Sequence, residues 1–191
     1  MKEKKYCPSA EHRLGPPGET PAFKEVQRTA DHQADLEARA KQGDTEAIIE
    51  LAVLTGNLPQ LKAMAESGNS EAAYALFEPL SGDRETTIEA WRWLCKSANA
   101  ADGKAQEKVG FWHSMAVWLP GGGPTFQWYR EEVGIQPDNR IAYMWYALAD
   151  SNGDSNASDG REFVKADMTP EDIVQAEQMV RDWKPGQCPR P

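Results

Sequence analysis

The segment RIAYMWYALADSNG, residues 140–153, decides the fold class of this chain. Its apolar and small residues recur at helical spacing, and the pattern ends at Gly153, a residue type that commonly stops a helix. A second segment, IEAWRWLCKSANAADG at residues 88–103, carries the same layout. Two copies of one helix pattern in 191 residues indicate a repeat architecture, so we predict an all-α fold.

Other parts of the chain also repeat. GDTEA at residues 43–47 and GNSEA at 68–72 place the same helix start 25 residues apart. The helix that contains Trp93 recurs at Trp145, 52 residues later. Helix-pair repeats usually have periods of about 34 to 47 residues, so the second offset contains extra chain. No stretch shows the sustained two-residue alternation of a strand.

The extra chain lies in residues 114–138, which contain GGGP and cannot form one continuous helix. We interpret this segment as an insertion between the two helices of a repeat. The predicted organisation has three parts: a flexible Pro/Gly-rich segment at residues 1–22, a helical repeat domain at 23–184, and a C-terminal tail at 185–191.

Several helix boundaries have local signals. Asn57 and Thr169 are predicted N-caps, because their side chains can accept hydrogen bonds from the first turn of a helix. Pro170 suits the first position of the last helix, which we expect to cap the repeat array. Gly43 and Gly56 are predicted to end the helices before them.

These helical segments resemble the Sel-one-like repeat, an α/α unit related to the tetratricopeptide repeat. Its A helix reads roughly A-x-x-x-L-G, and its B helix reads A-x-x-W-[YFL]-x-x-A-[AS]. AQEKVG at residues 105–110 and, more loosely, EAAYALF at 71–77 look like A helices. EAWRWLCKSA at 89–98 and IAYMWYALAD at 141–150 look like B helices. The resemblance covers about residues 36–184 and implies an α/α superhelix, or solenoid.

The resemblance implies a bacterial protein-binding module that is not an enzyme and needs no cofactor, because repeat motifs specify a fold rather than a chemistry. Family members scaffold complexes, serve secretion or envelope processes, or neutralise secreted toxins. Two functions therefore stay open: an inhibitor or immunity protein for a basic toxin, and a structural or regulatory subunit of an envelope or secretion assembly. A β-lactam or cell-wall hydrolase is disfavoured, because no nucleophile–base pair is visible in the sequence. The chain also lacks the paired cysteines of the β-lactam-binding members.

The sequence contains no Walker, GxSxG, HExxH or CxxC motif, and we predict no catalytic, cofactor-binding or metal-binding residue. Residues 150–162 begin like an EF-hand loop, but Arg161 stands where that loop requires a glutamate. We interpret them as a helix end followed by an Asx-rich turn. His113 is interpreted as a packed or capping residue.

The insertion carries the predicted partner-binding site. Its aromatic and arginine side chains are of the types enriched at interface hot spots: Trp118, Phe126, Trp128, Tyr129 and Arg130. The alternative is that the aromatic side chains fold back and fill a gap between repeats, and the sequence does not separate the two. The neighbouring Glu131 and Glu132 are expected to be solvated.

Charge restricts the class of partner. A net charge of −9 disfavours nucleic acid and anionic membrane surfaces, and it suits a basic protein. No apolar run reaches about 18 residues, so no direct membrane insertion is expected. The first residues lack the apolar core of a signal peptide. Their tether-like composition favours a periplasmic mature protein, and a cytoplasmic location is the alternative.

Three cysteines are present. Cys7 and Cys188 lie in the terminal extensions, each followed directly by proline. A disulfide between these two is predicted for an oxidising compartment, and two free surface thiols are the alternative. Cys95 lies within a helical pattern and is predicted to be a small buried apolar side chain.

Overall fold

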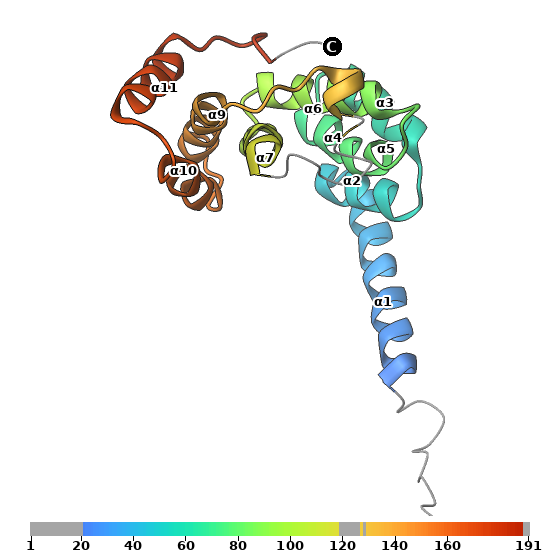
Figure 1. Cartoon of the computed structure of the whole chain (residues 1–191). Helices are drawn as coiled ribbons and strands as arrows, with labels where there is room; N and C mark the ends of the chain where they lie inside the picture. The colour runs from blue at the N-terminus through green and yellow to red at the C-terminus, as the bar shows by residue number, and fades with distance from the viewer. Residues whose placement is uncertain (1–20, 119–126, 128, 189–191) are drawn as a thin grey trace, which may run out of the picture. The chain divides into compact units, whose positions relative to one another are not determined.

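The structure is a computed structural model that describes residues 21–118, 127 and 129–188, with side chains at 29–114, 127 and 129–188. Its regular elements are all helices, and these ranges contain no strand (Figure 1). The all-α prediction is therefore confirmed. The chain forms two compact units, residues 1–51 and 52–191, so the predicted repeat domain at 23–184 extends over both. Among the described helices, none has the length and apolarity needed to cross a membrane.

The first unit contains α1 (Pro21–Lys41) and the start of α2 (Thr45–Leu54). Gly43 has a φ of +86°, which allows the chain to reverse between the two helices. Asp44 caps α2, since its Oδ1 accepts a hydrogen bond from Ala47 N at 3.2 Å. This backbone bond, followed by the hydrogen bond from Arg39, lowers the pKa of Asp44.

The second unit opens with α3 (Leu58–Glu66), α4 (Ser70–Ala75) and α5 (Phe77–Ser81). The predicted cap Asn57 accepts a hydrogen bond from Gln60 N at 3.3 Å. Residues 69–82 form two helices that meet at Leu76. Pro79 explains the break, because its ring would clash with the carbonyl of Ala75 in a continuous helix.

Two longer helices follow, α6 (Thr87–Asn99) and α7 (Gly103–Trp118), which pack against each other. Helix α7 continues to Trp118, so the first residues of the predicted insertion at 114–138 are helical. Within the predicted insertion, residues 129–133 form the π-helix η1 (Tyr129–Val133), which packs against α6. A π-helix adds one residue to a turn and often marks a functional or strained position.

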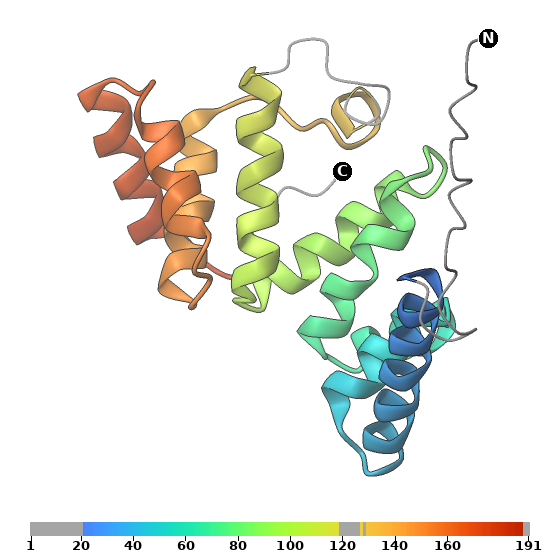
Figure 2. The same ribbon diagram turned by 90° about the horizontal axis from the view of Figure 1, so that it is seen from below.

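The chain ends with α9 (Asn139–Ser151), α10 (Ala157–Lys165) and α11 (Pro170–Asp182). Helix α9 packs against α7, α10 and α11, and Figure 2 shows α7 running alongside it. All residues from Ala142 to Ala149 are buried. The segment that decides the fold is apolar on every side because neighbours surround it, as expected of a fully buried helix.

Small residues allow these helices to approach closely. A Cβ atom at Gly110 of α7 would lie 3.2 Å from the carbonyl oxygen of Ala142. A Cβ atom at Gly160 of α10 would lie 2.5 Å from Cε1 of Tyr146. Both glycines face α9, so substituting either would push a neighbouring helix away from the central one.

Helix α10 was not predicted. Residues 150–162 were interpreted as a turn, and the turn ends sooner, because α10 begins at Ala157. Gly153, with a φ of +88°, ends α9 as predicted. The Asp150 carboxylate pairs with Arg161 Nη1 at 2.9 Å, which ties the end of α9 to α10.

Candidate partner-binding site

The predicted interface divides into residues that the structure describes and residues that it does not. Trp118 ends α7, but its side chain, together with Phe126 and Trp128, lies outside the described residues. Arg130 is exposed, and its role in partner binding stays a prediction. Tyr129 is fully buried, so assigning it to an interface is wrong. For this residue the alternative holds: the ring folds back and fills space between helices.

Tyr129 belongs to an aromatic cluster formed by Phe77, Trp91, Trp112 and Tyr129, which come from α5, α6, α7 and η1. Its ring stacks on Trp112 with centroids 4.2 Å apart. Phe77 and Trp91 approach at 6.2 and 6.1 Å. Burial, reinforced by the negative charge of Glu78, raises the pKa of Tyr129, so the hydroxyl stays neutral at any physiological pH. The cluster is a core that holds η1 against the helices.

Surface charges hold the outer side of η1. The Arg84 guanidinium pairs with Glu131 at 3.2 Å and with Glu132 through Nε at 2.9 Å. These glutamates are therefore ion-paired rather than merely solvated, which corrects the expectation for them. The three side chains are partly exposed, so each pair contributes only about 0–1 kcal/mol to stability. Their effect is to orient η1.

His113 is a packing residue. It is buried, and its Nδ1–H donates to the carbonyl oxygen of Gln136 at 2.9 Å. Burial lowers the pKa of His113, so the imidazole is neutral in the folded protein. The ring also packs edge-on against Trp91 with centroids 6.5 Å apart. This confirms the interpretation of His113 as a packed histidine.

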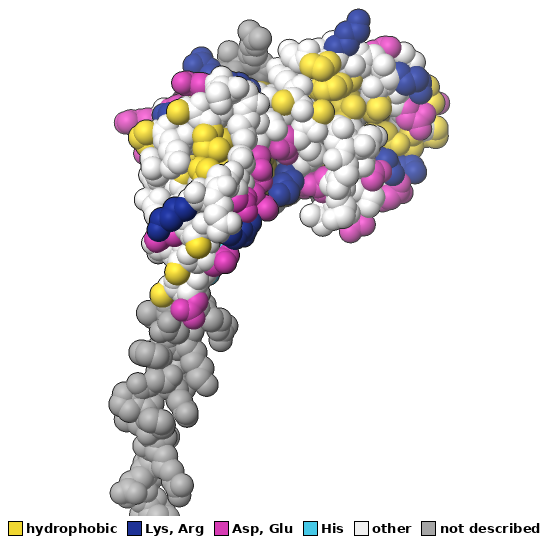
Figure 3. Space-filling model, turned by 180° about the vertical axis from the view of Figure 1, so that it is seen from behind, with side chains coloured by type: hydrophobic (Ala, Val, Ile, Leu, Met, Phe, Trp, Pro, Cys, Tyr) yellow, Lys and Arg dark blue, Asp and Glu magenta, His cyan; other side chains and the backbone are white. Residues whose placement is uncertain are grey.

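The strongest candidate for partner binding lies between α9 and α11 rather than in the insertion. A groove of about 510 Å³ opens there, and we name it the α9–α11 groove. Figure 3 shows hydrophobic side chains gathered over the α9–α11 part of the chain, bordered by charged ones. The lining residues are mostly apolar or aromatic: Ile141, Met144, Trp145, Gln178, Met179, Asp182, Trp183 and Gln187.

Two tryptophans form a corner of the groove. The rings of Trp145 and Trp183 meet edge-to-face, with centroids 6.0 Å apart and planes at 73°. Trp145 is only 1% exposed, and neither indole Nε1 has a hydrogen-bond partner within the described residues. Buried polar atoms are nearly always satisfied in folded proteins. The hydroxyl of Tyr129 in the closed aromatic cluster also lacks a partner within the described residues, so the two indole donors do not by themselves mark a site.

Helix α11 is set firmly at its start. Thr169 and Asp172 form a capping box, in which Asp172 N donates to Thr169 Oγ1 at 3.1 Å and Thr169 N donates to Asp172 Oδ2 at 3.3 Å. Arg140 of α9 donates to Gln175 of α11 at 2.8 Å. The predicted N-cap is confirmed, and the two walls of the groove are joined at one end.

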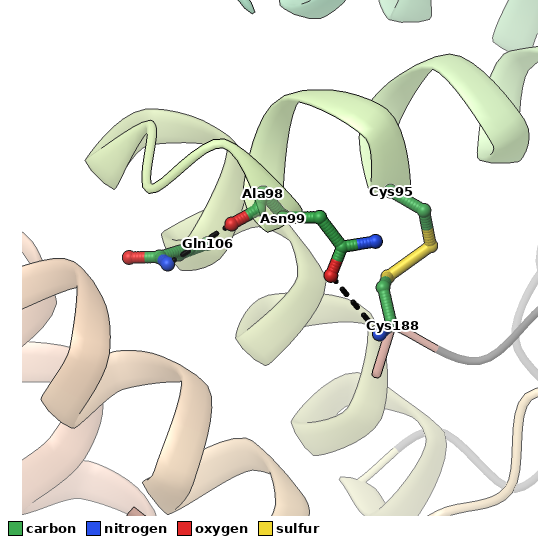
Figure 4. Close-up of a disulfide and its surroundings, with 5 residues drawn as sticks. All are labelled: Cys95, Ala98, Asn99, Gln106 and Cys188. Atoms are coloured by element: carbon green, nitrogen blue, oxygen red, sulfur yellow. Dashed lines mark hydrogen bonds between the residues drawn. A yellow bond between two sulfur atoms is a disulfide. The ribbon is translucent and has the colours of Figure 1, made fainter. Parts of the chain in front are cut away.

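A disulfide anchors the segment that follows α11, which forms the other end of the α11 wall of the groove. Cys188 bonds to Cys95 of α6, 93 residues earlier, and Cys188 N donates to Asn99 Oδ1 at 3.2 Å (Figure 4). The predicted Cys7–Cys188 pairing is therefore wrong, and Cys7 lies outside the described residues. After α11 the chain runs back to α6, which brings Cys188 to the buried Cys95 instead. Trp183 and Gln187 lie in the short segment anchored by this bond.

A buried glutamine of α7, Gln106, has a structural role. Gln106 is fully buried, and its Nε2 donates to the carbonyl oxygen of Ala98 at 3.0 Å (Figure 4). Its Oε1 accepts from Asn152 Nδ2 at 2.9 Å. These bonds join the ends of α6 and α9 through α7, so the disulfide is attached to the same rigid framework as the groove.

Sequence reasoning did not predict the groove, because the residues that line it come from α9, α11 and the segment after α11, and only the fold brings them together. A signal was present: Ile141 and Trp145 in α9, and Met179 and Trp183 at the end of α11, each repeat at four-residue spacing. Among the described residues, no group of three or more His, Cys, Asp or Glu side chains lies close enough to hold a metal ion. The groove therefore offers apolar contact, indole faces and one carboxylate.

No protein-family model matches this chain, and no curated protein matches it significantly. The resemblance to Sel-one-like repeats accordingly rests on the quoted motifs.

Proposed function

We propose that this chain is a non-enzymatic protein-binding module of the Sel-one-like repeat type, and that it holds a segment of its partner in the α9–α11 groove. The groove carries this proposal. About 510 Å³ accommodates a few side chains of a partner helix or extended segment, and its Met, Ile and Trp lining suits apolar anchors. Methionines adapt their shape to an incoming side chain, which favours a recognition surface over a fixed core.

The order of helix packing supports the repeat assignment. Helix α6 packs against α4 and α7, and α9 packs against α7 and α10, so each proposed B helix touches the A helix before it and the element after it. In both B helices the motif alanines are fully buried, namely Ala90 and Ala98 in α6 and Ala142 and Ala149 in α9. Close stacking of this kind is what builds an α/α superhelix.

The class of partner follows from charge. The net charge of −9 attracts a basic protein and speeds its encounter with this one. A basic secreted toxin satisfies this condition, so an inhibitor or immunity protein is the narrower form of the proposal.

The disulfide supports an oxidising compartment such as the periplasm. Disulfides are rare in the cytosol, where thiols are kept reduced. Rapid alkylation of native cells tests this location: Cys95 and Cys188 should resist the reagent until a reductant is added. Full alkylation without reductant would place the protein in a reducing compartment.

Site-specific photo-crosslinking in the native host tests the function. A photoreactive phenylalanine analogue at Met179, inside the groove, should capture one defined protein. The same analogue at Val174, a 61% exposed residue on the same helix outside the groove, is the matched control and should not.

The captured protein is then purified and titrated against variants. Met179→Asp should weaken binding at least about tenfold, because it places a charge in an apolar contact. Val174→Asp should change the affinity by less than about twofold, as expected for a solvent-facing position. Equal capture at both positions, or an unchanged affinity for Met179→Asp, would refute groove binding.

A further inference from the structure

The groove combines aromatic faces with a single charged group. Among the described residues, Asp182 is the one ionisable side chain in the lining, which there includes neither lysine nor arginine. The rest of the lining consists of apolar or aromatic side chains and two glutamine amides. A groove of this composition attracts a cation, since both the carboxylate and the indole faces present negative potential.

The carboxylate of Asp182 retains capacity to bind a ligand. One Oδ2 hydrogen bond comes from Gln178 Nε2 at 2.8 Å. Within the described residues Asp182 makes no ion pair. The neighbouring Arg181 directs its guanidinium to Gln178 Oε1, at 3.2 Å from Nε and 2.8 Å from Nη2. A carboxylate offers about four acceptor positions, so most of those on Asp182 remain open.

We propose that the α9–α11 groove binds an arginine side chain of the partner segment, a proposal that rests on the function proposed above. The guanidinium forms a two-bonded pair with Asp182 and stacks on an indole ring, while the aliphatic stem packs against Met144 and Met179. Trp183 is the partly exposed ring on which the flat guanidinium stacks, and the buried Trp145 holds that ring in place by an edge-to-face contact at 6.0 Å.

Arginine fits this site better than lysine. A guanidinium is planar, weakly hydrated and able to make two parallel hydrogen bonds to one carboxylate. A lysine ammonium is compact and strongly hydrated, so its transfer into an apolar corner costs more. The occupant is therefore an apolar segment with a central arginine, and the acidic charge of the whole chain favours its approach.

Nuclear magnetic resonance of the indole N–H groups tests this assignment on the full chain. The probes are N-acetyl-arginine methylamide, its lysine counterpart, and N-acetyl-citrulline methylamide, which has the shape of the arginine probe without the charge. Trp145→Phe and Trp183→Phe assign the two signals. The arginine probe should shift both signals and bind about five- to tenfold more tightly than the citrulline probe.

Paired variants of α11 show whether Asp182 is responsible. Asp182→Asn should remove the preference for arginine over citrulline. Glu177→Gln removes the same charge from an exposed position on the same helix, outside the lining, and should leave the preference intact. Equal binding of arginine and citrulline, an unchanged preference in Asp182→Asn, or no shift of either signal would each overturn the proposal.

The two proposals fail separately. A partner that crosslinks at Met179 and binds Asp182→Asn with unchanged affinity leaves the groove as a docking site and refutes the arginine. Loss of groove crosslinking refutes the proposed function itself.

Discussion

The aromatic cluster around Tyr129 and the α9–α11 groove contain the same residue types, but the first is a closed core and the second is an open surface. In the cluster, Tyr129 stacks on Trp112 at 4.2 Å, and other rings close around it. In the groove, Trp145 and Trp183 meet edge-to-face at 6.0 Å, and about 510 Å³ remains open beside them. Aromatic residues therefore do not by themselves mark an interface. Whether another element closes over them decides the outcome, and that depends on chain segments distant in sequence.

The largest expected effect lies in the cluster. Tyr129→Ala should lower the free energy of unfolding by about 3–5 kcal/mol, the usual cost of deleting a buried aromatic ring. Tyr129→Phe keeps the ring and should cost less than about 1.5 kcal/mol, as volume-conserving changes do. Urea denaturation followed by tryptophan fluorescence measures both. A Tyr129→Ala variant as stable as the wild type would show that the ring is not core.

The next effect concerns the wall of the groove. Cys95→Ser combined with Cys188→Ser should lower the free energy of unfolding by about 2–4 kcal/mol, because the bond closes a long loop in the unfolded chain. Release of Trp183 and Gln187 should also weaken binding of the arginine probe. Cys7→Ser is the control and should alter neither quantity.

Peptide mapping without reductant identifies the bond directly. It should recover the Cys95 peptide linked to the Cys188 peptide. Recovery of Cys7 linked to Cys188 would instead restore the pairing expected from the sequence and would leave the groove wall unanchored.

The sequence predicted those features that local chemistry determines. The cap at Thr169 followed by Pro170 specifies the start of α11 through hydrogen bonds among neighbouring residues. Gly43 and Gly153 end their helices because glycine adopts positive φ without strain. Helix α9 was also predicted from the sequence, and its eight consecutive residues from Ala142 to Ala149 are buried.

Features set by distant contacts were not predictable in this way. Cys95 and Cys188 look unrelated in sequence, and only the return of the chain after α11 brings them together. Tyr129 became core because α5, α6 and α7 supply rings around it. Trp145 packs between helices and is almost fully buried, and the groove beside it forms only where the end of α11 brings Trp183 against α9.

A smaller effect tests the face of α9 that packs against α10, rather than the face that lines the groove. Gly160→Ala should destabilise the protein by about 1–3 kcal/mol, because the new methyl group would lie 2.5 Å from the buried ring of Tyr146. Gly82→Ala is a matched control, since a Cβ atom there meets nothing within 4 Å. Thermal melting compares the two. Equal melting temperatures would mean that α9 and α10 pack more loosely than described.

The smallest effect comes from a substitution at the start of α11. It tests whether a loss of stability there also weakens ligand binding in the groove. Thr169→Ala should cost about 1 kcal/mol, since it removes the side-chain half of the capping box at an exposed position. Thr169→Ser keeps the hydroxyl and should be nearly neutral. Asp182 and Trp183 lie several turns further along and are held by the disulfide. Binding of the arginine probe to the folded protein should therefore stay within about twofold of the wild type. A large loss of binding with this small loss of stability would show that the groove depends on the start of α11, and that the disulfide alone does not hold its wall in place.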